Sequence, residues 1–367
     1  MKKLFVNLME NSYPIFINSN YDGVSECLHE FCSDSKIVIV SDTNVNYYQS
    51  EELIQTLKSS GYDIYKYVFE AGEKSKNLDT VVDIYKFLLA LGVDRNDIIL
   101  AFGGGVVGDI AGFVAATYLR GIKFVQIPTT LLAQVDSSVG GKVGVNFNNC
   151  KNIVGAFYQP KFVYINTNSL RTLPIREIRS GLAEIIVHCL IGDSFLFEYI
   201  EANFAKIFQH DNDVLKYVIS KNCLNKIAVV EQDEKDQGLR AILNFGHTIG
   251  HAIESVYNFE LLHGECVSIG IVGAFRIACH IGMTDEGTLL RVINILNKIG
   301  LPYYLEGLDV DKVFYQMLFD KKIVNNTLTF ILPKSIGQVI QHPVGNRDLI
   351  QKILKELSKG PVELEGI

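Results

Sequence analysis

The sequence predicts two domains, an α/β domain of Rossmann-like type with a mostly parallel sheet in residues 1–170 and a mainly α-helical domain in residues 171–367. Three observations support this division. Short apolar runs alternate with helical patterns in the first half, which is typical of parallel strands joined by helices. One of these runs continues directly into three glycines. Beyond about residue 170, strand-like runs become rare and long helical patterns take over.

The first half reads as strands and helices in turn. Apolar runs of strand length occur at 36–41, 63–69, 97–102 and 123–127, and helical patterns span 50–60 and 77–91. Because buried parallel strands are apolar on both faces, we expect these runs to form the centre of a sheet covered by helices.

The second half is dominated by helical patterns. They cover about 176–210, 212–233, 244–258, 264–282, 285–300 and 346–357. A short pair of strands is expected at 327–332 and 338–341. No linker rich in proline, glycine or serine is visible, so we expect two tightly packed domains with the active site between them.

Composition excludes several classes of protein. The net charge is -7 and no cluster of lysine and arginine stands out, which argues against a nucleic-acid-binding protein. The seven cysteines are scattered and odd in number, as expected of reduced thiols. The start of the sequence, 1–7, lacks the apolar core of a signal peptide, and no run of about 18 apolar residues occurs. We therefore expect a cytoplasmic protein without a membrane span.

The glycine run Gly103–Asp109 follows one predicted strand and precedes a helical pattern. Glycines let a backbone approach a pyrophosphate closely, and the N-terminus of a helix offers N–H groups to an anion. The segments Ala71–Lys76 and Pro128–Thr130 end neighbouring elements at the same predicted edge of the sheet, where such folds bind nucleotides. The alternative interpretation of the glycines is a tight turn from strand to helix.

Three histidines and a glutamate suggest a metal site in the second domain. His247 and His251 are four residues apart, and on a helix they would share one face. Glycine precedes each of them, His263 follows twelve residues after His251, and Glu184 begins another apolar helix. A carboxylate with two or three imidazoles is the ligand set of a catalytic zinc that keeps one position open. A single histidine on a helix is usually structural, and it is the grouping of three that favours a metal site.

Charged residues among glycines and apolar residues indicate an anionic ligand. Asp136, Lys142, Lys151 and Asn152 stand in such surroundings, where an uncompensated charge costs several kcal/mol. Further along, Lys226 and Arg240 flank Asp233–Glu234. Lysine and arginine suit a phosphate and a carboxylate, although each could also form an ordinary surface salt bridge.

Together these motifs resemble 3-dehydroquinate synthase, a family of the sugar-phosphate cyclase superfamily. The resemblance rests on long segments in the same order as in the family, namely 103–121, 127–146, 151–160, 181–184, 243–254 and 262–265. It implies an enzyme that uses NAD and a divalent metal, zinc or cobalt. The reaction converts a phosphorylated keto acid, 3-deoxy-D-arabino-heptulosonate 7-phosphate, into 3-dehydroquinate and phosphate in the shikimate pathway of aromatic amino-acid biosynthesis.

The resemblance also assigns roles to residues. The metal ligands are Glu184, His247 and His263, so His251 falls on a phosphate-side position and is not a ligand. The NAD-contacting positions are Asp42, Ala71, Gly72, Glu73, Lys74, Ser75, Lys76, Gly105, Val106, Val107, Gly108, Asp109, Thr129, Thr130, Lys142, Lys151, Ser169, Leu170, Arg171 and Thr172. The substrate positions are Asp136, Lys142, Asn152, Lys226, Arg240, Asn244, His251 and one of Lys321 and Lys322. Arg120 resembles an arginine that reaches the neighbouring subunit's site, which implies a homodimer.

One departure from the family concerns the segment after Glu184. The family pattern is Glu-x-x-Lys, but the fourth position here is Val187. His188 points about 100° further around the helix, so it is a doubtful replacement for the lysine. Three alternatives therefore stay open: a related cyclase whose substrate lacks the carboxylate, such as sedoheptulose 7-phosphate or glucose 6-phosphate; a metal-dependent NAD alcohol dehydrogenase; and a catalytically silent relative. The presence of Arg240, which suits a carboxylate, argues against the first.

Overall fold

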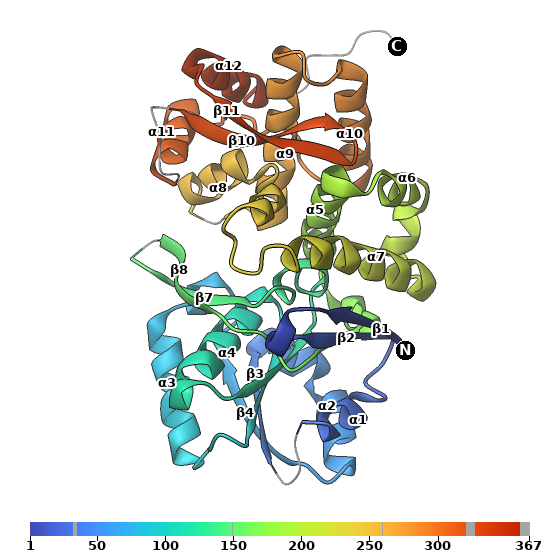
Figure 1. Ribbon diagram of the computed structural model, residues 1–367, viewed down its shortest axis with the longest axis vertical. Coiled ribbons are helices and arrows are strands. Elements are labelled where there is room, and N and C mark those ends of the chain that lie inside the picture. The colour runs from blue at the N-terminus through green and yellow to red at the C-terminus, as the bar shows by residue number, and fades with distance from the viewer. Residues whose placement is uncertain (32–34, 149, 259, 321–326, 360–367) are drawn as a thin grey trace. The chain divides into compact units, whose positions relative to one another are not determined.

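The computed structural model describes residues 1–31, 35–148, 150–258, 260–320 and 327–359 (Figure 1). The chain forms two compact units. The first comprises Met1–Pro174 and Lys206–Lys235, and the second comprises Ile175–Ala205 and Asp236–Ile367. The predicted boundary at residue 170 assigns Lys206–Lys235 to the second domain, whereas these residues pack with the first unit.

A sheet of seven strands forms the centre of the first unit within the described part of the chain. Its order is β1-β2-β9-β6-β5-β3-β4, and all neighbouring strands are parallel except β1 and β2. The strands are β1 (Lys2–Val6), β2 (Tyr13–Asn18), β3 (Lys36–Asp42), β4 (Asp63–Phe69), β5 (Ile98–Gly103), β6 (Lys123–Pro128) and β9 (Val163–Asn166). The mostly parallel α/β fold is thus confirmed, while β1, β2 and β9 were not predicted.

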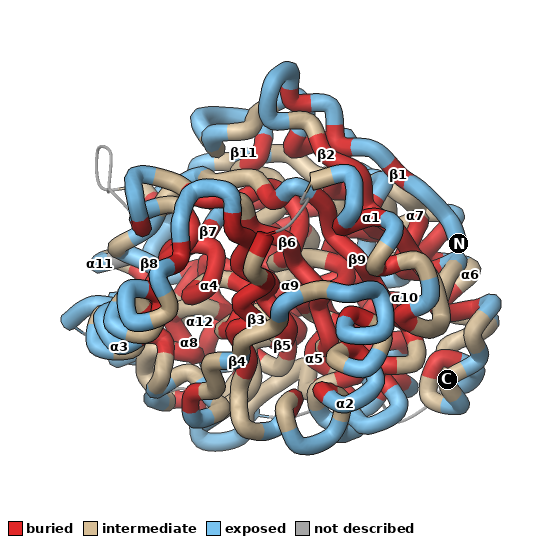
Figure 2. The backbone as a smooth tube through the Cα atoms, turned by 90° about the horizontal axis from the view of Figure 1, so that it is seen from below, coloured by how far each residue is buried: buried red, intermediate tan, exposed pale blue. Residues whose placement is uncertain are grey.

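Helices cover both faces of this sheet. Helices α1 (Val24–His29) and α2 (Thr43–Ser59) cover one face, and α3 (Leu78–Ala90) and α4 (Gly105–Thr117) cover the other. Successive side chains of a strand point to opposite faces, so Val38 joins the core beneath α3 and α4 while Ile39 joins the core beneath α1 and α2. Figure 2 shows the central strands as the buried part of this unit.

Two further elements complete the first unit. The hairpin of β7 (Lys142–Phe147) and β8 (Cys150–Phe157), which was not predicted, packs on α4. Helix α7 (Asn212–Val230) packs on β1, β2 and a π-helical turn at Ala133–Ser137.

Helices make up most of the second unit. They are α5 (Ile175–Gly192), α6 (Ser194–Phe208), which ends beyond the unit, α8 (His247–Val256), α9 (His263–His280), α10 (Glu286–Ile299), α11 (Val310–Asp320) and α12 (Arg347–Leu357). The predicted helix over 176–210 is two helices, because the Asp193 carboxylate accepts a hydrogen bond from Leu196 N and starts α6. The strand pair is confirmed as β10 (Leu328–Ser335) and β11 (Gln338–Val344), and α11 was not predicted.

Helix α9 is the centre of the second unit, where it contacts α5, α8, α10, α12 and β10. Its backbone touches that of α8. A Cβ at Gly270 would lie 1.9 Å from Gly246 O, and a Cβ at Gly250 would lie 3.0 Å from Cys266 O. A Cβ at Gly246, which precedes His247, would lie 2.9 Å from Ile271 N. The glycines before His247 and His251, together with Gly270, therefore permit close packing of α8 on α9. Among the described helices, none has both the length and the apolar character that crossing a lipid bilayer requires.

Candidate active site

A carboxylate and two imidazoles converge in the second unit. Glu184 lies on α5, His247 begins α8 and His263 begins α9. Glu184 Oε1 lies 3.3 Å from His263 Nε2 and 3.6 Å from His247 Nε2. The carboxylate is buried, with an exposed fraction of 2 %. The three predicted metal ligands are therefore close enough to share one ion.

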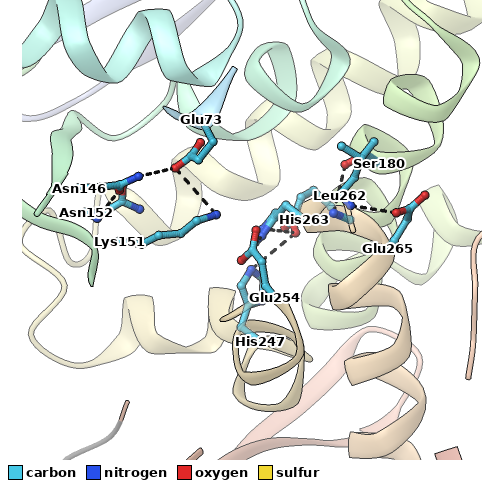
Figure 3. A network of polar contacts seen from close by, with 12 residues as sticks. Glu73, Asn146, Lys151, Asn152, Ser180, His247, Glu254, Leu262, His263 and Glu265 are labelled. Carbon is cyan, nitrogen blue, oxygen red and sulfur yellow. Dashed lines mark hydrogen bonds and ion pairs between the residues drawn. The ribbon is translucent and has the colours of Figure 1, made fainter. Parts of the chain in front are cut away.

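The second ring nitrogen of each histidine contacts an acceptor oxygen, and Figure 3 shows this contact for His263 and Glu254. His247 Nδ1 lies 3.0 Å from Phe245 O, and because a carbonyl can only accept, Nδ1 donates. His263 Nδ1 lies 3.5 Å from Glu254 Oε2. A neutral imidazole that donates through Nδ1 has its lone pair on Nε2, which here faces Glu184. Metal-binding histidines are commonly held in this way, so the residues fit a divalent cation.

The carboxylates of Glu184 and Glu254 favour a positive charge at His263. Burial lowers the pKa of His263, but the Glu184 and Glu254 carboxylates on its two sides raise that pKa more, to about 10. Two buried carboxylates around one ring stabilise a cation there. In a metal site the ion provides that charge and the imidazole remains neutral.

Close packing between α5 and α9 fixes the position of His263. Gly264 N donates to Ser180 Oγ at 3.1 Å, and a Cβ on Gly264 would lie only 2.2 Å from Ser180 O. Leu262 N donates to Glu265 Oε2 at 2.8 Å. Ser180 is one helical turn before Glu184 on α5, so the contact that anchors α9 lies next to the carboxylate.

His251 lies in the same cluster of rings. A ligand nitrogen of each of His247, His251 and His263 lies within 4.8 Å of the others. The structure therefore brings together all three imidazoles of the initial hypothesis.

Apart from Lys142 and Lys151, which lie on the antiparallel β7–β8 hairpin, the residues predicted to contact NAD follow the carboxyl ends of parallel strands in the first unit. Asp42 ends β3, Ala71–Lys76 follow β4, Gly105–Asp109 follow β5, Thr129 and Thr130 follow β6, and Ser169–Thr172 follow β9. The carboxyl ends of parallel strands are where open α/β sheets bind ligands.

The glycine run makes a sharp turn into α4. A Cβ on Gly103 would lie 2.4 Å from Val107 Cγ2, so the turn requires glycine at this position. The same turn brings the N–H groups at the start of α4 to the edge of the sheet, where they suit a pyrophosphate. The structure confirms the tight turn from strand to helix, and the nucleotide-binding role of these glycines stays a prediction.

A polar network extends from this edge to the β7–β8 hairpin. Lys76 Nζ lies 2.6 Å from Asp109 Oδ2 and 2.5 Å from Asn152 Oδ1. Burial raises the pKa of Asp109, and the Lys76 ammonium lowers it without cancelling the shift. Asn146 Nδ2 donates to Glu73 Oε1 at 2.8 Å, and Lys151 Nζ lies 3.9 Å from the same oxygen (Figure 3). Asn152, predicted to bind substrate, therefore contacts the predicted NAD residue Lys76.

Lys226 and Asp136 form a close pair in the first unit. Lys226 Nζ on α7 lies 2.5 Å from Asp136 Oδ1 and 2.6 Å from Asp136 O, in the π-helical turn. Lys226 is only 5 % exposed, so the alternative of a surface salt bridge is wrong for this residue. Asn222 of α7 also donates a hydrogen bond to this π-helical turn, at Val135 O. π-Helical turns are frequent at functional sites.

The remaining predicted site residues differ in exposure. Arg240 is 2 % exposed on the 3₁₀ turn Leu239–Asn244, which also carries Asn244. Lys142 and Arg120 are exposed. Val187, in place of the family lysine, is fully buried in α5. Lys321 and Lys322 lie outside the described residues.

Sequence reasoning assigned no role to Ser180 or Glu254. Both lie one helical turn from a residue that was singled out, Ser180 before Glu184 and Glu254 after His251. That spacing was the available signal. On its own, however, it is also typical of a solvated helix face.

Comparison with known proteins agrees with this geometry. Residues 66–180 match the family model of the 3-dehydroquinate synthase N-terminal domain, and residues 181–323 match that of the C-terminal domain. The 3-dehydroquinate synthase of Acetivibrio thermocellus is 58% identical over 360 residues, which cover 98% of this chain and 100% of the relative.

Two solved structures share the fold over nearly the whole chain. The 2-epi-5-epi-valiolone synthase of Streptomyces hygroscopicus subsp. jinggangensis 5008, with NAD+ and Zn2+ bound, has a TM-score of 0.89 at 28% identity and covers 96% of this chain and 98% of its own. A 2-deoxy-scyllo-inosose synthase, complexed with carbaglucose-6-phosphate, NAD+ and Co2+, has a TM-score of 0.82 at 25% identity and covers 97% and 100%.

Fold and site together define a sugar-phosphate cyclase, an NAD- and metal-dependent enzyme. Identity is much higher to the synthase of Acetivibrio thermocellus than to the two cyclases with other products. The chain belongs to the 3-dehydroquinate synthase family.

Proposed function

We propose that this chain converts 3-deoxy-D-arabino-heptulosonate 7-phosphate into 3-dehydroquinate and phosphate with NAD and a divalent metal, zinc or cobalt. The observation that carries the proposal is the convergence of Glu184 Oε1 on the Nε2 atoms of His247 and His263. These three atoms are the proposed metal ligands. A bound metal would supply polarisation of the substrate's hydroxyls, and bound NAD would supply a reversible hydride acceptor.

The chain's own residues bind and orient an anionic substrate. Arg240 can hold a carboxylate through two parallel hydrogen bonds, which a lysine cannot do. Binding of the phosphate and the adjacent hydroxyls is proposed for His251, Asn244, Lys142, Asn152 and Lys226. Asp136, already close to the Lys226 ammonium, keeps that charge in place. Holding the reacting groups in one geometry supplies much of the rate acceleration in such a site.

The remaining cofactor residues are proposed to hold NAD at the carboxyl edge of the sheet. Lys76 joins the Asp109 carboxylate to the Asn152 amide, so the dinucleotide and substrate residues of the first unit form one connected network. Lys321 and Lys322, one of which is proposed to contact the substrate, lie outside the described residues.

We also propose that the working form is a cytoplasmic homodimer. Arg120 is exposed, and its φ of 66° lies in the left-handed region, which is uncommon for a residue other than glycine. An exposed arginine on an unusual turn suits the role that the resemblance implies, which is contact with the site of a neighbouring subunit. The six cysteines within the described ranges are all free thiols, in agreement with a reducing compartment.

The test is phosphate release by the purified protein with NAD and zinc. Release with 3-deoxy-D-arabino-heptulosonate 7-phosphate, abolished by a chelator and restored by zinc, is the expected result. Release only with sedoheptulose 7-phosphate or glucose 6-phosphate would favour a cyclase with another substrate. NADH that accumulates without phosphate would indicate a dehydrogenase, and no turnover with any substrate would indicate a silent relative.

A further inference from the structure

Glu254 is a buried carboxylate beside the proposed metal ligands. It lies on α8, seven residues after His247 and three after His251, so it faces the same side of the helix. Its side chain is 5 % exposed, and Oε2 lies 3.5 Å from His263 Nδ1. The other nitrogen of the same ring lies 3.3 Å from Glu184 Oε1. The imidazole of His263 thus lies between two carboxylates, one at each nitrogen, and Figure 3 shows the contact with Glu254.

Burial of an ionised carboxylate in this place lowers folding stability unless charged or hydrogen-bonding partners offset it. Taking an ionised group out of water costs several kcal/mol, and the cost is offset only by good partners. An ionised carboxylate can only accept hydrogen bonds, so at 3.5 Å it favours the form of His263 in which Nδ1 carries the proton. That form leaves the lone pair on Nε2, the atom that faces Glu184.

The two histidines of the cluster are held by different groups. Phe245 O, a neutral backbone carbonyl, holds Nδ1 of His247, and no substitution of a side chain can remove this oxygen. Glu254, a charged side chain, holds Nδ1 of His263. A negative charge behind an imidazole increases the basicity of the nitrogen that faces the ion.

We propose that Glu254 is a positioning residue for His263, which it orients and polarises so that Nε2 binds the divalent cation tightly. This inference rests on the ligand set under the proposed function, and it adds a carboxylate behind that set. Glu254 itself touches neither substrate nor ion in this account. Its effect is therefore expected first in metal affinity and only through that in turnover.

The experiment measures zinc affinity of the purified, metal-stripped full chain by competition with a chromophoric chelator. Glu254→Gln keeps the size and an acceptor oxygen but removes the charge, and it should weaken zinc binding by about 10- to 100-fold. Glu356→Gln is the matched control, because Glu356 in α12 pairs with Arg276 at 2.7 Å in the same unit and contacts none of the proposed ligands in the described structure. The control should bind zinc as the parent protein does.

A second variant and a second readout separate positioning from folding. Glu254→Asp keeps the charge but shortens the side chain, so it should weaken zinc binding less than Glu254→Gln. In the His263→Ala background, Glu254→Gln should cause no further loss of affinity, because its effect acts through that ring. The absorption spectrum of bound cobalt should change in Glu254→Gln and remain that of the parent in Glu356→Gln.

The possible results are distinct. Parent-like zinc affinity in Glu254→Gln would overturn the inference, as would an equal loss with and without His263. A parent protein that binds zinc through His263 but releases no phosphate would refute the proposed function while leaving the role of Glu254 supported. A parent protein that binds no divalent metal would refute both.

Discussion

Gly264→Ala tests whether the contact between α5 and α9 sets the position of His263. The added Cβ would lie 2.2 Å from Ser180 O and 2.5 Å from Ser180 Cα. These are backbone atoms, so no side chain can rotate away. Reaching an ordinary contact of about 3.4 Å requires the start of α9 to move by about 1.2 Å from α5. Overpacking of this kind costs about 1–3 kcal/mol of folding stability.

The same displacement should weaken the metal site. His263 precedes Gly264 directly, and its Nε2 lies 3.3 Å from Glu184 Oε1. A misplacement of about 1 Å in such a site can lower the rate on the order of 100-fold. We expect Gly264→Ala to lower the melting temperature, the zinc affinity and phosphate release together.

Gly192→Ala provides the matched control for this experiment. Gly192 is the last residue of α5, and a Cβ there would meet no atom within 4 Å. This variant should keep the melting temperature, zinc affinity and turnover of the parent protein. A Gly264→Ala variant with unchanged zinc affinity and turnover would refute the account of how α9 is anchored.

Three further predictions follow from the site. Glu184→Ala and His263→Ala should each abolish zinc-dependent phosphate release while circular dichroism shows a folded protein, and activity retained in either would exclude that residue as a ligand. Val187→Lys, which restores the family pattern, should give turnover equal to or above that of the parent; a loss on the order of tenfold, about 1.4 kcal/mol, would show a pocket rebuilt around valine. An equal mixture of Arg120→Ala and His247→Ala subunits, unfolded and refolded together, should recover roughly a quarter of the parent activity, since half the dimers then carry one complete site. No recovery in a mixture shown to contain heterodimers would contradict a role for Arg120 across the interface.

The sequence predicted the strands and helices that have a distinct apolar pattern. The apolar runs at β3, β5 and β6 are buried on both faces, so composition alone marked them as central strands. By contrast, β1 has a mixed pattern of exposed and buried residues over only five positions, and β8 has no buried residue, so neither gives a distinct pattern. The break at Asp193 was missed because the apolar spacing continues across it from α5 into α6.

The candidate site shows the same limit. The residues alone suggested a metal site of His247, His251, His263 and Glu184, and the resemblance excluded His251 from the ligands. Neither could show which ring nitrogen of each histidine faces the ion. That depends on Phe245 O and Glu254, whose contacts form only after α8 and α9 pack. The glycines before the two histidines seemed unfavourable for a helix, yet the approach of Gly250 to Cys266 O explains why a side chain is not tolerated there.

The most direct test of the central claim is a crystal structure of the zinc-loaded protein, with anomalous scattering recorded on both sides of the zinc absorption edge. The account predicts one zinc peak about 2.0–2.2 Å from Glu184 Oε1, His247 Nε2 and His263 Nε2, with another coordination position open. A zinc peak on other residues, or coordination through Nδ1 of either histidine, would contradict it.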